Sequence, residues 1–304
     1  MIITWLTGGL GNQMFQYAAG LALAHRRRTI LKLDVSWFRE YAEHEEHNRY
    51  ALGCFNISEH FATREEIERT RGVRLTRVER WSKTWAQRLH FFRYARRMDE
   101  VGTWHRAKSF AYDPEFAELP DETYLEGMWQ SEKFFEPISD LVRLHFSFRY
   151  PPPTDVLKTV RLIQSKHSVA VHFRRGDYIR NEQYARVNGA LGLGYYQRAV
   201  EMMLQRDSDL ELFVFSDDID AVEKEFRPDC PCHFVRSAGE WNAFDGMRMM
   251  SMCDHAIIAN STFSWWAAWL GEGPHKRVIA PKRWFADGSA YDSADLVPNR
   301  WERV

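Results

Sequence analysis

The sequence is poor in cysteine and contains no long apolar run. Its four cysteines (Cys54, Cys230, Cys232 and Cys253) are too few for a disulfide framework in a chain of 304 residues, because disulfide scaffolds are small and dense in cysteine. No stretch of about eighteen apolar residues is present, so we expect no membrane-spanning helix. The first residues also lack the pattern of a secretory signal. These absences predict a cytoplasmic protein.

The chain also lacks a charge excess of either sign. Its 41 Lys and Arg residues nearly balance 42 Asp and Glu residues, so bulk charge does not favour a nucleic-acid partner. One segment departs from this balance, because residues 74–97 carry eight basic side chains and a single acid, Glu79. Their spacing predicts a basic amphipathic helix. Such a helix packs on its own domain or makes a peripheral contact with the anionic inner surface of a membrane.

Two incomplete patterns exclude other ligands. The Cys230-Pro-Cys232-His233 cluster has no second cluster to complete four metal ligands, so we expect no metal there. The first strand-to-helix turn, Gly9-x-Gly11, lacks the third glycine of a dinucleotide fingerprint, since Met14 stands in its place. What remains is either a turn whose amides and Asn12 approach a bound group, or a tight turn without a ligand.

Apolar strands alternating with helices predict an α/β fold with parallel sheets. Pro151-Pro152-Pro153 cannot continue a helix and forms a stiff spacer, so we place a domain boundary there, giving domains 1–150 and 151–304. Predicted strands span 2–6, 29–35, 168–173, 211–216, 232–236, 255–259 and 277–281, with a further strand near Tyr124. Predicted helices span 13–27, 155–165, 194–206, 245–253 and 262–270.

Polar residues collect where three of the predicted strands end. The run Val169-Ala-Val171 stops at His172, and Arg174 and Arg175 follow as an anion clamp with planar donor forks. A second strand ends at Asp217. A third is followed by Asn260, Ser261, Thr262 and Ser264, which open a helix whose free amides favour an anion; capping by a hydroxyl is the plainer alternative. Arginines and a helix N-terminus together suit a diphosphate.

The segment His172-Phe-Arg174-Arg175-Gly176-Asp177-Tyr178 resembles the His-x-Arg-Arg-Gly-Asp-Tyr signature of the α-1,2-fucosyltransferases, glycosyltransferase family 11. Three other stretches resemble further blocks of that family, in the same order along the chain. These are Gly8-Gly-Leu-Gly-Asn-Gln-Met-Phe-Gln-Tyr17, Phe215-Ser-Asp-Asp218 and Asn260-Ser-Thr-Phe-Ser-Trp-Trp-Ala-Ala-Trp-Leu270. The sequence is therefore similar to the bacterial branch of the family.

The resemblance implies a GT-B fold, in which an N-terminal acceptor-side domain and a C-terminal GDP-sugar-binding domain are both Rossmann-like. It places the donor site in the cleft between them. It also implies an inverting transfer of L-fucose from GDP-fucose to the 2-hydroxyl of a terminal galactose, in assembly of a surface polysaccharide such as O-antigen. No metal or other cofactor is implied.

The resemblance also assigns residues. Arg174 and Arg175 match the arginines that hold the donor diphosphate, and a general base is expected at Asp177 or Glu182, an alternative that the sequence leaves open. His172 matches a histidine near the nucleoside, Ser264 a hydroxyl beside the phosphates, and Asp245 a carboxylate that reads guanine. The remaining donor-binding candidates belong to the matching blocks: Gly9, Gly11, Asn12, Gln13, Asp217, Asn260, Ser261 and Thr262.

Two other functions fit parts of the sequence. Asp218-Ile-Asp220 is an Asp-x-Asp pattern, with which other sugar transferases bind a divalent cation. A non-catalytic protein that binds a glycan or a sugar nucleotide would need the same anion clamp and no base.

Overall fold

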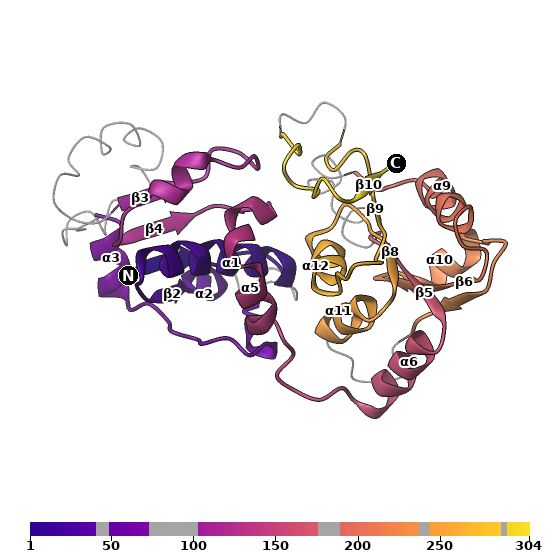
Figure 1. The fold of residues 1–304 in the computed structure, drawn as a ribbon. Coiled ribbons are helices and arrows are strands. Elements are labelled where there is room, and N and C mark those ends of the chain that lie inside the picture. The colour runs from indigo at the N-terminus through magenta and orange to yellow at the C-terminus, as the bar shows by residue number, and fades with distance from the viewer. Residues whose placement is uncertain (41–48, 73–102, 176–188, 237–242, 287–290) are drawn as a thin grey trace. The chain divides into compact units, whose positions relative to one another are not determined.

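The computed structural model describes residues 1–40, 49–72, 103–175, 189–236, 243–286 and 291–304 (Figure 1). The chain divides into two compact units. The first comprises residues 1–53 and 57–142, and the second comprises residues 54–56 and 143–304. Residues 143–150 group with the second unit because Phe146 packs against Phe55 and Trp266, with ring centroids 5.1 Å away in both pairs.

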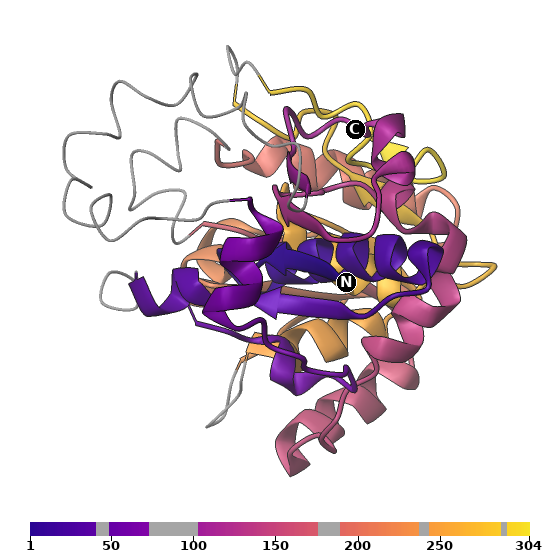
Figure 2. The ribbon, with the colours of Figure 1, turned by 90° about the vertical axis from the view of Figure 1, so that its left-hand side faces the viewer.

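The first unit is built on a parallel sheet of four strands in the order β2-β1-β4-β3. Helix α1 packs on β1 and β2 (Figure 2), because most of its buried residues are apolar or small. The strands are β1 (Ile2–Trp5), β2 (Leu31–Asp34), β3 (Thr103–Arg106) and β4 (Thr123–Glu126). The helices are α1 (Leu10–Arg27), α2 (Ser36–Glu40) and α3 (Arg64–Thr70), with short 3₁₀ turns η3 (Pro114–Glu118), η4 (Glu132–Phe134) and η5 (Glu136–Ile138). The 3₁₀ turn η1 (Leu52–Cys54) and helix α5 (Ser139–His145) each begin in the first unit and end in the second.

The second unit contains a parallel sheet of six strands in the order β10-β9-β8-β5-β6-β7. This is the strand order of a doubly wound nucleotide-binding domain. The strands are β5 (His167–Phe173), β6 (Leu210–Ser216), β7 (Cys232–Phe234), β8 (His255–Ile257), β9 (Val278–Ala280) and β10 (Glu302–Arg303). The helices are α6 (Thr154–Gln164), α9 (Leu193–Leu204), α10 (Ile219–Glu225), α11 (Ala243–Ser251) and α12 (Thr262–Leu270).

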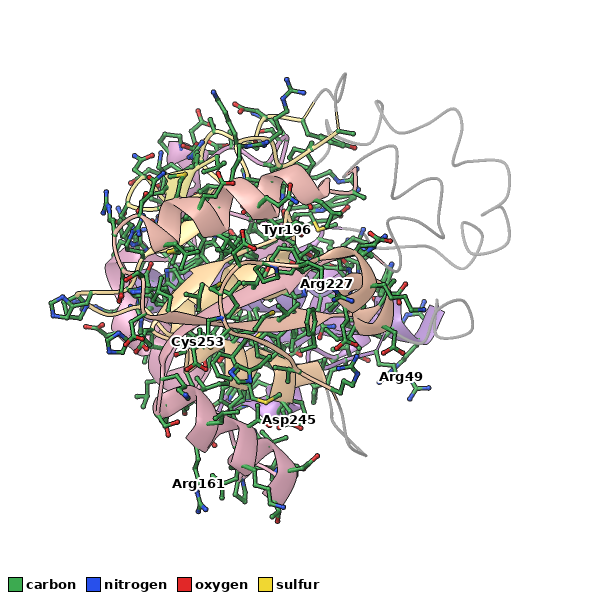
Figure 3. All side chains as sticks on the ribbon, turned by 90° about the vertical axis from the view of Figure 1, so that its right-hand side faces the viewer. Arg49, Arg161, Tyr196, Arg227, Asp245 and Cys253 are labelled. Carbon is green, nitrogen blue, oxygen red and sulfur yellow. The ribbon has the colours of Figure 1, made fainter. Side chains whose placement is uncertain are left out.

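Helices cover both faces of the second sheet, with α9 and α10 on one side and α6, α11 and α12 on the other (Figures 1 and 3). The alternation along β5 follows from this. Val169, Val171 and Phe173 join the apolar core beneath α9 and α10, whereas His172 faces the other side, 5.8 Å from the ring of Phe263 on α12. The polar ring of His172 thus lies between the sheet and α12, near the carboxyl end of β5.

The expected α/β class with parallel sheets is confirmed, and every predicted strand and helix outside residues 74–97 is present to within a few residues. Strands β3 and β10 and helices α2, α3, α5 and α10 were not predicted. The predicted basic helix of residues 74–97 lies outside the described part of the chain. Of the helices that the structure describes, none is both long and apolar enough to cross a bilayer.

Candidate donor-binding site

The strand order of the second unit reverses between β5 and β8. The connection after β5 leads to α9 on one face, and the connection after β8 leads to α12 on the other. Such a reversal opens a crevice at the carboxyl ends of the two strands, where ligands bind in folds of this type. Val171 pairs with Ile257 in register, so Arg174 and Asn260 follow at equivalent positions. Two of the predicted polar clusters therefore meet at one place.

Asp217, at the carboxyl end of β6, organises both arginines of the clamp. Its Oδ2 lies 3.1 Å from Nη1 of Arg174, and its Oδ1 accepts a hydrogen bond of 2.9 Å from the backbone N–H of Arg175. The predicted donor-binding Asp217 thus fixes the loop after β5 and the direction of the Arg174 side chain. Its contact with an arginine makes it a positioning residue.

The two arginines have different surroundings. The guanidinium of Arg175 forms two parallel hydrogen bonds with Glu225 on α10, at 2.6 and 3.2 Å. These bonds raise the pKa of Arg175 and lower the pKa of Glu225. A bidentate carboxylate thus occupies the donor fork of Arg175, and the diphosphate contacts of Arg174 and Arg175 stay predictions. No pattern in the sequence marks Glu225 as this partner.

His172 is a buried, neutral imidazole at the same strand end. Its side chain is 5% exposed, and burial, with the charge of Arg174 adding to it, lowers its pKa to about 4. Its Nδ1 is buried and has no hydrogen-bond partner within the described ranges. Because nearly all buried polar atoms in proteins are paired, this nitrogen is a ready contact for a bound ligand.

Helix α12 presents its first amides at the carboxyl end of β8. The N-cap residue Ser261 makes no side-chain capping hydrogen bond, so the capping alternative from the sequence does not account for this serine. The hydroxyl of Ser264 turns back to the carbonyl of Ser261, 3.3 Å away. The amides at the start of the helix, with the helix dipole, therefore favour an anion.

Asn260 and Asp245 support the site from within the unit. The side-chain amide of Asn260 donates hydrogen bonds of 3.0 Å to the carbonyls of Gly189 and Trp284, which joins three segments of the chain. Asp245 on α11 is completely buried and lies 3.4 Å from Nη1 of Arg248 (Figure 3). The guanine-reading role of Asp245 stays a prediction.

The glycine turn after β1 in the first unit is tightly built. Gly8 has φ +70°, and a Cβ placed on it would lie 2.7 Å from Nδ2 of Asn12, so only glycine fits there without strain. The Asn12 side chain accepts a hydrogen bond of 3.0 Å from Gln130, after β4. Gly9 caps α1 without a side chain, and Gly11 is buried.

Two glutamines at the start of α1 hold the surrounding segments. Gln13 donates to the carbonyls of Gly8 and Arg49 and accepts from the amide of Ala51. Gln16, which the sequence did not single out as a site residue, accepts from the amide of Thr7 and donates to its hydroxyl. Both side chains are buried, so their visible function is structural; the donor contact of Gln13 stays a prediction.

The remaining candidates divide between an ion pair and the undescribed segments. Asp220 lies on α10, and its Oδ1 is 3.2 Å from Nη2 of Arg236. One acid of the Asp218-Ile-Asp220 pattern therefore forms an ion pair with an arginine. The described ranges hold no group of three or more His, Cys, Asp or Glu side chains arranged to bind a metal ion. Asp177 and Glu182, the candidate bases, lie outside the described residues.

Known proteins resemble this chain over most of its length. A family model described as glycosyl transferase family 11 matches residues 109–301. An α-1,2-colitosyltransferase from Escherichia coli is 30% identical over 311 residues, covering 100% of this chain and 99% of the relative. The O-antigen biosynthesis glycosyltransferase WbnK from Escherichia coli is 30% identical over 314 residues, covering 97% and 98%. Galactoside alpha-(1,2)-fucosyltransferase 1 from Aotus azarae is 27% identical over 175 residues, covering 52% of this chain and 46% of the relative.

Proposed function

Because this chain belongs to glycosyl transferase family 11, we propose that it transfers L-fucose from GDP-fucose to the 2-hydroxyl of a terminal galactose. It is a glycosyltransferase of the GT-B class, with two units built on parallel sheets. The observation that carries the proposal is that Arg174 follows β5 and the uncapped start of α12 follows β8, the two neighbouring strands between which the second sheet reverses. Both carry positive charge where a diphosphate would lie.

In the proposed reaction the acceptor oxygen attacks the anomeric carbon of fucose from the side opposite GDP, which inverts that carbon. The new glycosidic bond forms as the bond to the β-phosphate oxygen breaks, and its electron pair leaves with GDP. Arg174 and the first amides of α12 stabilise the charge that grows on the leaving phosphate. The acceptor proton passes to a carboxylate.

Asp177 and Glu182 are the two proposed bases. Replacing each by its amide keeps the shape and removes the basic oxygen. The base is the residue whose Asn or Gln variant loses transfer while GDP still binds with unchanged affinity in calorimetry. If both variants retain transfer, the proton goes elsewhere and this part of the proposal is wrong.

No metal ion is required in this proposal, since Arg174 and the helix amides take the part of a cation. The alternative uses a divalent cation held by Asp218 and Asp220. Turnover in excess EDTA should equal turnover without it. A loss of activity that added Mg²⁺ or Mn²⁺ restores would support the cation mechanism instead.

A second possible donor is GDP-colitose, because one relative that this chain matches over its full length is named a colitosyltransferase. Colitose is fucose without its 3-hydroxyl, so the two donors share the GDP portion and the anomeric centre. Purified enzyme should be given GDP-fucose and GDP-colitose in competition, with lactose as acceptor, and the products weighed by mass spectrometry. Fucosylated lactose as the main product supports the proposal, and colitosylated lactose assigns the other donor.

Multiple turnovers exclude a protein that only binds a glycan or a sugar nucleotide. We place the reaction in the cytoplasm, in assembly of a surface polysaccharide, with contact to the inner membrane through residues 74–97. Sedimentation with anionic vesicles should weaken when Arg88, Arg93, Arg96 and Arg97 are changed to Glu. Unchanged sedimentation would remove the basic segment from that contact.

A further inference from the structure

A cavity of about 520 Å³ lies at the carboxyl edge of the first sheet, between the segments that follow β3 and β4. Its volume is typical of a small-molecule site. Tyr112, Trp129 and Phe134 line it with aromatic rings, and Lys108, Asp113 and Glu115 add charged groups.

The aromatic wall is held in a fixed arrangement. The ring of Phe134 lies 5.2 Å from Trp129 and 5.0 Å from Tyr112, edge-on to both. His105 stacks on Trp129 with a centroid distance of 5.7 Å. Flat apolar faces beside polar groups suit a pyranose, whose C–H face packs on an aromatic ring while its hydroxyls bond to charged side chains.

Trp129 shows two irregularities at once. Its backbone has φ +54°, which is rare for a bulky residue. Its side chain is 1% exposed, and its indole N–H is buried without a hydrogen-bond acceptor among the residues that the structure describes. Strained backbone and unpaired buried donors both cost stability and gather at functional sites. An oxygen of a bound ligand is the partner that this N–H lacks.

One of the segments that line the cavity is hydrogen-bonded to the glycine turn. Gln130, directly after Trp129, donates the hydrogen bond of 3.0 Å to Asn12. The carboxyl ends of parallel strands share one edge of a sheet, so β1, β3 and β4 all end here.

Resting on the proposed function, we propose that this cavity binds a pyranose ring of the acceptor glycan, next to the terminal galactose that receives the donor sugar. Tyr112 forms its apolar wall, the indole N–H of Trp129 donates to one of its oxygens, and Lys108 and Glu115 bond to its hydroxyls. The enzyme would thereby prefer an extended galactoside over a single galactose.

The kinetic test compares lactose, which has a second ring, with methyl β-galactoside, which has none. Tyr112→Ala and Glu115→Gln should raise KM for lactose about fivefold, the effect of one lost contact, and leave KM for methyl β-galactoside unchanged. The control is Glu118→Gln. Glu118 lies on the same 3₁₀ turn, but its carboxylate pairs with Arg26, 3.0 Å away, so KM should not change for either acceptor. Equal changes for the two acceptors, or none, would overturn the proposal.

A binding test separates this inference from the proposed reaction. In protein labelled with ¹⁵N at the tryptophan indoles, the Trp129→Phe variant identifies the Trp129 N–H signal. Lactose should shift that signal saturably, and the Tyr112→Ala variant should need more lactose. Transfer to lactose without such a shift refutes the cavity alone. A shift in a protein that transfers no sugar from any GDP donor supports the cavity and refutes the reaction.

Discussion

The polar turn at the start of α1 and the strand ends of the second sheet both carry buried polar groups, but they differ in whether those groups have hydrogen-bond partners. In the turn, Gln13 and Gln16 form hydrogen bonds with neighbouring backbone and with the Thr7 hydroxyl. At the second sheet, a buried nitrogen of His172 has no partner within the described ranges, and α12 begins without a side-chain cap. The polar groups of one family motif are thus paired within the protein, whereas those of another leave a buried nitrogen and a helix start available to a ligand.

The largest expected effect comes from Arg174→Ala. Loss of a preorganised charge at the leaving group should lower kcat/KM by about 10²–10³-fold, with unfolding by denaturant unchanged. The matched control is Arg236→Ala, whose guanidinium pairs with the exposed Asp220, and its kcat/KM should stay within about twofold. If Arg174→Ala lowers kcat/KM no more than the control does, the strand ends of the second sheet do not bind the donor.

Gln16→Leu tests the scaffold half of the comparison. It leaves the buried amide of Thr7 without its acceptor, so the free energy of unfolding should fall by about 1–3 kcal/mol. The affinity of the folded protein for GDP should not change in calorimetry. A weaker affinity for GDP at full stability would make the turn a ligand site as well.

Gly8→Ala and Gly9→Ala refine the same region. The first forces alanine to φ +70° and against Asn12, at a cost of about 1–3 kcal/mol in unfolding free energy. Gly9 has φ −74° and open space around its Cβ position, so alanine there should be nearly neutral. Equal losses of stability at the two positions would show that the left-handed backbone of Gly8 does not determine the effect.

The last prediction concerns pH. The folded pKa of His172 is lowered to about 4, while an unfolded histidine titrates near 6.5. As pH falls from about 6.5 toward 4, the unfolded state therefore binds a proton that the folded state refuses, and stability declines. His172→Gln should flatten that decline, measured by urea unfolding at several pH values. An NMR titration of His172 near pH 6.5 in the folded protein would contradict this account.

The sequence predicted the fold well because its strands and helices alternate with clear periodicity and end at glycines, prolines or polar clusters. It placed Arg174, His172 and Ser261 at strand ends, and parallel topology then brought them to one edge. Strand β3 was missed, since Thr103–Arg106 carries charge and no regular alternation.

Contacts between distant segments could not be predicted. The carboxylates that hold the two arginines, Asp217 and Glu225, follow Arg175 by 42 and 50 positions, and no spacing rule connects them. The left-handed backbone of Trp129 was equally hidden, because that conformation is rare for a bulky residue and no local pattern marks it.

The central claim is that positive charge from Arg174 and the first amides of α12 holds the donor's diphosphate without a cation. A crystal structure with GDP, grown in EDTA, tests it directly. We predict pyrophosphate oxygens within hydrogen-bond distance of Arg174 and of the amides of Thr262–Ser264. Pyrophosphate lying elsewhere, or GDP that binds only when a divalent cation joins it to Asp218 and Asp220, would contradict the account.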